Sequence, residues 1–86
     1  MKQETVDILK FTVGEGDFET IERAAQSLKD GNMVIVQFAD ISEESEAQYL
    51  KILEDTITII DGSTNRISTD THIFAPCGIV VQCFEN

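Results

Sequence analysis

Three side chains near the end of the chain are of types that bind metals or act as nucleophiles: His72, Cys77 and Cys83. A structural zinc ion normally takes a tetrahedral set of ligands with closely paired cysteines, and this sequence has no such pair. A cysteine nucleophile needs a histidine base that a further group holds in place, and no such group stands out. We therefore expect no catalytic residue, no metal site and no cofactor here, and we expect these residues to pack in strands.

Two stretches resemble loops that bind phosphate or calcium. GEGDF (14–18) begins like a nucleotide-binding turn, but it lacks a further glycine and any lysine, and its acids would repel phosphate. DISEESE (40–46) is acidic, but it lacks the glycine and the spaced ligands of an EF-hand loop. A turn followed by a helix start explains both stretches. Because no catalytic constellation is found elsewhere, we do not expect an enzyme.

One basic side chain stands alone in the second half of the chain. Arg66 is the only lysine or arginine after Lys51, in a chain with 16 acidic and 6 basic side chains. It lies among short apolar runs that are typical of strands. An arginine binds a carboxylate through two parallel hydrogen bonds, so Arg66 could hold an acidic group of a partner. The plainer alternative is a solvated strand residue that pairs with Asp61 or Asp70.

Charge and length exclude several kinds of protein. A formal net charge of −10 leaves no basic stripe for nucleic acid and opposes direct binding of the domain to an anionic membrane. No apolar run reaches the roughly 18 residues that a membrane span requires. MKQETVDILK (1–10) has no features of a secretory signal, so we expect a cytoplasmic protein with reduced cysteines. At 86 residues the chain should form one domain, 1–86.

The elements that must position these residues follow from hydrophobic periodicity. Alternation predicts a strand over 5–13, and helical spacing predicts a first helix from an Asp17 cap to Gly31. The β-branched run 33–38 predicts a strand that is covered on both faces. Ser42 should cap a second helix that ends at Gly62, although the β-branched segment TITII (56–60) leaves a strand open for its last residues.

Three short runs complete the expected sheet: NRIS (65–68), THIFA (71–75) and GIVVQCF (78–84). STDT (68–71) has the composition of a hairpin turn, and Pro76 separates the last two runs. The order β-α-β-α-β-β-β predicts an α/β fold, namely an α+β two-layer sandwich with a mixed sheet and both helices on one face.

The second face of this sheet would be uncovered. It would expose a larger apolar patch than soluble monomers usually tolerate, so we expect a two-fold dimer with stacked sheets. The residues that we expect on the dimer face are Val34, Val36, Ile79 and Val81.

With these elements in order, the chain resembles the core domain of SepF, a cell-division protein, and it is most similar to the archaeal type. The resemblance covers 5–82 and rests on DFETIERAAQSLKDGNMVIVQF (17–38), IIDGSTNRIS (59–68) and HIFAPCGIVV (72–81). It implies a non-enzymatic scaffold at the division septum that dimerises, polymerises and binds the C-terminal tail of FtsZ. The family's N-terminal membrane-targeting helix and linker are absent here. Either the chain is a trimmed core domain that reaches the membrane only through that missing segment, which is the alternative we favour, or anchoring requires another protein.

The resemblance also implies roles for single residues. The family's basic peptide-contacting residue falls on Arg66, and its large apolar residue falls on His72, which departs from the bacterial pattern. Phe74 lies on the same face and could serve as the apolar anchor instead. Gly62 matches a turn glycine associated with assembly, although a helix C-terminal glycine explains it equally well. Apolar side chains of a tail, at about 1.5–3 kcal/mol each when buried, could offset the entropy of ordering it.

A second class of function stays open. Small mixed α/β sheets also serve as regulatory domains that bind small molecules, and fold alone does not decide function. A ligand that binds the folded state raises its melting temperature, so a thermal-shift screen with amino acids and nucleotides separates the two classes.

Overall fold

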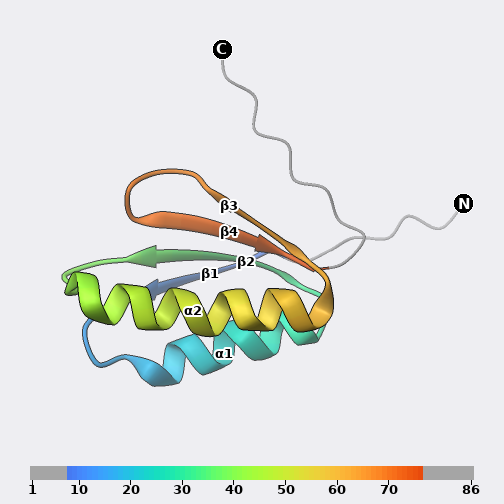
Figure 1. Cartoon of the computed structure of the whole chain (residues 1–86), viewed down its shortest axis with the longest axis horizontal. Helices are drawn as coiled ribbons and strands as arrows, with labels where there is room; N and C mark the ends of the chain where they lie inside the picture. The colour runs from blue at the N-terminus through green and yellow to red at the C-terminus, as the bar shows by residue number, and fades with distance from the viewer. Residues whose placement is uncertain (1–7, 77–86) are drawn as a thin grey trace, which may run out of the picture.

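The helices and strands form two layers (Figure 1). The computed structural model describes residues 8–76. In chain order the elements are β1 (Ile8–Val13), α1 (Phe18–Lys29), β2 (Met33–Phe38), α2 (Glu43–Ile60), β3 (Ser63–Arg66) and β4 (Thr71–Ala75). Both helices cover the same face of the sheet (Figure 1), so the predicted α+β fold is confirmed. The last expected strand, 78–84, lies outside the described residues.

The four strands form one mixed sheet in the order β1-β2-β4-β3. β1 and β2 are parallel and are joined through α1, whereas β4 is antiparallel to both β2 and β3. β3 begins at Ser63 rather than at the expected Asn65, because the chain enters the sheet directly after Gly62. The hairpin turn lies where STDT predicted it, and the Ile67 N–H donates to the Thr71 carbonyl at 2.9 Å.

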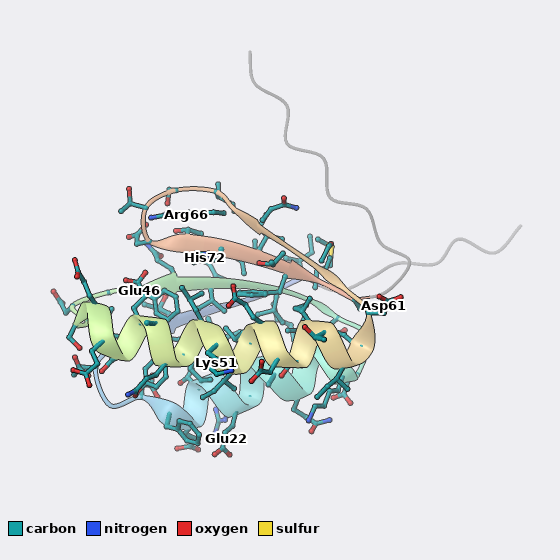
Figure 2. All side chains as sticks on the ribbon, in the orientation of Figure 1. Glu22, Glu46, Lys51, Asp61, Arg66 and His72 are labelled. Carbon is teal, nitrogen blue, oxygen red and sulfur yellow. The ribbon has the colours of Figure 1, made fainter. Side chains whose placement is uncertain are left out.

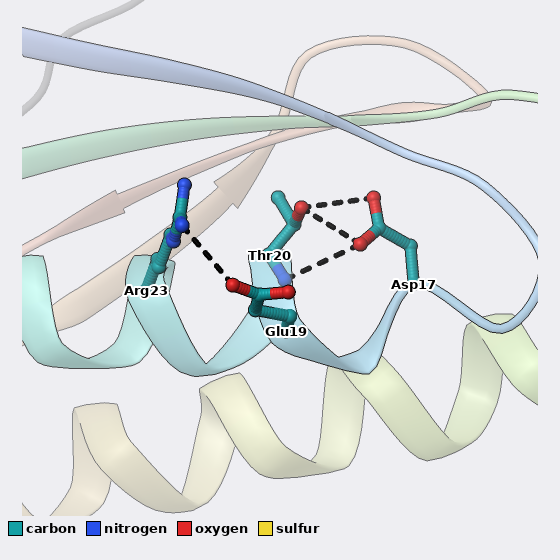
Figure 3. Close-up of polar contacts among 4 residues, drawn as sticks. All are labelled: Asp17, Glu19, Thr20 and Arg23. Atoms are coloured by element: carbon teal, nitrogen blue, oxygen red, sulfur yellow. Dashed lines mark hydrogen bonds and ion pairs between the residues drawn. The ribbon is translucent and has the colours of Figure 1, made fainter.

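Polar side chains fix the start of each helix. Asp17 accepts hydrogen bonds from the Thr20 N–H at 3.4 Å and from the Thr20 hydroxyl at 2.8 Å (Figure 3). Ser42 accepts one from the Ser45 N–H at 3.2 Å. These bonds satisfy N–H groups that have no partner within a helix, so both predicted caps are confirmed.

The loop before α1 also contacts the start of α2. The Glu15 carboxylate accepts hydrogen bonds from the Ser42 N–H at 2.9 Å and from the Ser45 hydroxyl. The Ser45 hydroxyl bond is the main reason that the pKa of Glu15 lies below its usual value, and the bonds to Ser42 add to it. Glu15 therefore joins two loops at the carboxyl ends of the parallel strands.

The segment 56–60 is helical, which decides between the two alternatives that its sequence allowed. The Thr56 and Thr58 hydroxyls each donate at 3.0 Å to the carbonyl four residues earlier, so their polar groups are satisfied within α2. Burial of Ile57 in the core outweighs the weak helix propensity of β-branched residues.

Gly62 is needed for a different reason from the one expected. The left-handed residue at the end of α2 is Asp61, with φ 56° and ψ 42°, and not the glycine. A Cβ on Gly62 would collide with the Ala75 carbonyl oxygen and lie 3.2 Å from Cδ1 of Ile57. The close approach of the chain to β4 therefore excludes a side chain here. Gly31, by contrast, has the left-handed φ of 94° predicted for the end of α1.

The core lies between the helices and the sheet. In β2 every second side chain is buried, and these are Val34, Val36 and Phe38. They pack with residues of both helices: Ile21, Ala24, Ala25, Leu28, Tyr49, Leu53 and Ile57.

This arrangement overturns one assignment made from the sequence. Val34 and Val36, which were expected on the dimer face, are fully buried beneath the helices, so that expectation is wrong for both. The alternate residues of β2, Met33, Ile35 and Gln37, lie on the open face and are half-buried. Ile79 and Val81 lie outside the described residues.

Candidate functional site

The expected peptide-binding residues meet on the β3–β4 hairpin. Arg66 lies opposite His72, and Thr64 lies opposite Phe74, across the two strands. His72 in turn lies opposite the buried Val36 of β2. Since directly opposed residues of antiparallel strands point to the same face, these side chains all lie on the helix side of the sheet. Figure 2 shows Arg66 and His72 on the hairpin.

Phe74 is part of the core and not a surface anchor. Its side chain is fully buried and belongs to the cluster beneath the helices. The expectation that it contacts a peptide directly is therefore wrong for the described structure. The alternation in THIFA placed His72 and Phe74 on one face correctly, but it did not reveal that the helices cover this face.

Arg66 is exposed and is held by the hairpin turn. Its Nε donates to the Ser68 carbonyl and its Nη2 donates to the Thr69 carbonyl, both at 3.0 Å. Within residues 8–76 no carboxylate forms an ion pair with it, so neither Asp61 nor Asp70 is its partner. The guanidinium is thus oriented by its own turn, and Nη1 makes no hydrogen bond to the described part of the chain.

Asp70 stabilises the same turn. Its carboxylate accepts hydrogen bonds from the Ser68 hydroxyl at 2.9 Å and from the Thr71 hydroxyl at 3.1 Å. These bonds, the one from Ser68 first, lower the pKa of Asp70 from its usual value. The backbone between Arg66 and Thr71 is therefore fixed by side chains from both ends of the turn.

His72 lies opposite Arg66 but is nearly buried. Its imidazole is 9% exposed and packs edge-on against Phe38, with ring centroids 5.9 Å apart and an interplanar angle of 71°. Burial lowers the pKa of His72, the Arg66 charge lowers it further, and Glu46, Glu54 and Asp70 act in the opposite direction. Nε2 is buried and has no hydrogen-bond partner in the described residues.

One stripe of α2 faces the hairpin. Glu46, Leu50 and Glu54 are spaced by four residues, which places them in a row on one side of a helix. The charges of Glu46 and Glu54 both raise the pKa of His72, so this row lies on the side of α2 toward β4. Leu50 lies between the two carboxylates and is only partly buried. We define the hairpin–α2 corner as Thr64, Arg66, Glu46, Leu50 and Glu54.

The sequence reasoning missed the contribution of α2. Leu50 packs against the core at the edge of the apolar face of α2, and this edge remains partly accessible. The four-residue spacing of Glu46, Leu50 and Glu54 was the available signal. This spacing could not predict the hairpin–α2 corner, because a row of residues on a helix does not reveal which strand packs beside it.

β3 is the exposed edge of the sheet. It is the last strand in the order of the four, and each of its residues is exposed. An edge strand offers free backbone N–H and C=O groups to which an extended peptide can pair. The described residues enclose no pocket, and no three metal-binding side chains converge among them. No helix in residues 8–76 is long and apolar enough to cross a membrane.

The sequence and fold match known proteins. The sequence model of the family described as cell division protein SepF matches residues 16–81. The fold matches a SepF-like protein from Pyrococcus furiosus with a TM-score of 0.77 and 26% identity, covering 95% of this chain and 100% of that chain. It also matches a SepF-like protein from Archaeoglobus fulgidus with a TM-score of 0.74 and 20% identity, covering 92% and 96%. No curated protein sequence gives a match.

Proposed function

Since the chain belongs to the SepF family of cell division proteins, we propose that it is a non-enzymatic scaffold of the division septum that binds the C-terminal tail of FtsZ. The proposal includes self-association, and it includes attachment to the membrane through a segment outside these 86 residues. The observation that carries the binding site is the edge strand β3, each of whose residues is exposed, next to the accessible row of α2.

The binding mode that we propose is addition of the tail as a further strand along β3. Backbone hydrogen bonds then supply affinity, and side chains that alternate along the peptide supply specificity. On the helix side, an apolar side chain of the tail would contact Leu50, and a tail carboxylate would accept a hydrogen bond from Arg66. Glu46 and Glu54 favour basic side chains in the tail beside that apolar contact.

The turn prepares Arg66 for this role. Its side chain has already lost much of its conformational freedom, because Nε and Nη2 are bonded to the carbonyls of Ser68 and Thr69. A pre-ordered side chain reduces the entropy that binding would otherwise cost. Nη1 remains to donate to a ligand.

Self-association is proposed through the open face of the sheet, with a corrected set of residues. Ile8 is 59% exposed and pairs in register with Met33, and Ile35 pairs with Ile73. These four apolar side chains lie on the face opposite the helices. Stacking this face on that of a second copy would remove their apolar surface from water.

Fluorescence anisotropy with a labelled FtsZ tail peptide from the same organism tests the proposal. We expect saturable binding at roughly micromolar strength, and weaker binding by Arg66→Glu. The matched control is Arg23→Glu on α1, where Arg23 is exposed and pairs with Glu19 at 3.1 Å (Figure 3). It makes the same change in net charge, but on a helix instead of on β3. No binding by a folded protein, or equal loss in both variants, would contradict the proposed site.

The small-molecule alternative has less support. It needs a concave site, and no pocket is found in the described part of the chain. The thermal-shift screen with amino acids and nucleotides remains its test, and a raised melting temperature with either would favour it.

A further inference from the structure

His72 is the only histidine in the chain, and it lies where the two layers meet. Its ring is packed between Phe38, at 5.9 Å, and Phe74, at 6.3 Å between centroids. Only 9% of the residue is exposed. An imidazole in this position belongs to the packing that holds the β3–β4 hairpin against the rest of the domain.

The buried nitrogen makes this packing specific for the neutral ring. Nε2 has no hydrogen-bond partner among the described residues. A neutral imidazole carries one proton, which can lie on Nδ1 and leave Nε2 bare. An imidazolium must carry an N–H at Nε2 as well, and this donor would be buried without an acceptor.

The charges around the ring come from three directions. β3 contributes Arg66, which lies directly opposite His72 on the same face. α2 contributes Glu46 and Glu54, and the hairpin turn contributes Asp70. β2 contributes no charge, since its residues against the ring, Val36 and Phe38, are apolar.

The balance of these effects opposes protonation. The three carboxylates raise the pKa of His72, but burial is the largest effect and lowers it, and Arg66 lowers it further. The pKa of His72 in the folded protein therefore lies below its ordinary value of 6.5.

We propose that His72 is an acid-sensitive latch: the neutral ring holds the β3–β4 hairpin against α2, and its protonation releases the hairpin. The additional N–H at Nε2 of a charged ring is buried, so it reaches water or a carboxylate only if the hairpin moves away from the core. The latch concerns the fold itself and does not depend on the proposed binding of FtsZ.

The sign of the pH dependence follows from linkage. The unfolded state binds the proton more tightly than the folded state, so acid favours opening. The contribution of His72 to stability is complete above pH 6.5 and is lost as the pH falls from 6.5 through the folded-state pKa. For each unit by which the folded pKa is lowered, the opening equilibrium rises up to about tenfold.

A proton NMR titration of the single imidazole tests the latch in the wild-type chain. Between about pH 8 and about pH 5 we expect a midpoint below 6.5, and a return to about 6.5 in concentrated urea. Faster amide hydrogen exchange in β4 should accompany protonation, after correction for the intrinsic pH dependence of exchange. A folded midpoint at or above 6.5, or protonation without faster exchange in β4, would overturn the proposal.

His72→Gln provides the matched variant, because it keeps a polar side chain that does not titrate. We expect its melting temperature to change less than that of the wild type between about pH 7 and about pH 5, a range above the titration of ordinary carboxylates. Equal pH dependence in the two proteins would overturn the latch. Should this variant not fold, the titration of the wild type decides alone.

Discussion

Arg66 and His72 lie directly opposite each other across β3 and β4 and point to the same face, yet one is exposed and the other is nearly buried. β4 lies between β2 and β3 in the sheet, whereas β3 is the last strand of the described sheet and each of its residues is exposed. The boundary between the covered and the open part of the sheet therefore runs through this pair. We place the binding surface on its open side and the proton-sensitive packing on its covered side.

Gly62→Ala should destabilise the fold. A methyl group at this position would collide with the Ala75 carbonyl oxygen, which belongs to the backbone and cannot rotate away. We expect a loss of about 1–3 kcal/mol in the free energy of unfolding, measured by urea denaturation. Gly14→Ala is the control, because a Cβ there meets only the Ala39 carbonyl oxygen, at 3.4 Å. Equal stability of the two variants would contradict the close-approach explanation.

Phe74→Ala should act on stability and not specifically on binding. Removing a fully buried aromatic side chain leaves a cavity and costs about 3–5 kcal/mol, a large part of the stability of a small domain. Ile67→Ala, at a residue that is 49% exposed, should cost less than about 0.5 kcal/mol. Urea denaturation of both variants measures the difference. A stable Phe74→Ala protein that merely fails to bind the peptide would restore the role expected from the sequence.

Replacing the Glu15 carboxylate should change how the stability of the fold depends on pH. Its folded pKa is lowered by the bonds from Ser45 and Ser42, so its contribution is present above its ordinary pKa of 4.5 and is lost as the pH falls through the folded value. Glu15→Gln should therefore melt at a lower temperature at neutral pH, and the difference from the wild type should shrink in acid. Glu22→Gln, at an exposed glutamate of α1 without side-chain hydrogen bonds to residues 8–76, is the control. A constant difference at all pH values would contradict this role.

Ile35→Glu should abolish self-association through the open face. A carboxylate placed among Ile8, Met33 and Ile73 would have to lose its hydration when two sheets stack. Light scattering after size exclusion should then report a monomer for the variant and a dimer for the wild type. Ile59→Glu is the matched control, since Ile59 is 75% exposed on α2, in the other layer. A dimer that survives Ile35→Glu but not Ile59→Glu would place the interface on the helices.

The fold was largely predictable because its signals are local. Asp17 and Ser42 are of residue types that commonly cap a helix when they stand just before an amphipathic segment. The apolar spacing of both helices also continues without a break. The segment 56–60 was ambiguous, since propensity and periodicity disagreed there. Packing of Ile57 against the core decided it.

The site was predicted less well because it depends on which face the helices cover. In β2 both sets of alternate residues are apolar except for Gln37, so the pattern did not show clearly that Val34 and Val36 face inward. For His72 and Phe74 in β4 the sequence likewise did not show whether their face of the sheet is covered by the helices. The partners of Arg66 were also missed, because backbone carbonyls of a turn have no signature in the sequence.

The most direct test of the central claim is amide NMR mapping of the domain with the unlabelled FtsZ tail peptide. Peptide addition along the edge predicts shift changes and slower hydrogen exchange in β3, Ser63–Arg66, together with shift changes at Leu50 on α2. It predicts no comparable change in β1, the strand at the opposite end of the described sheet. Changes confined to β1 or to α1, with β3 unaffected at saturating peptide, would contradict the account.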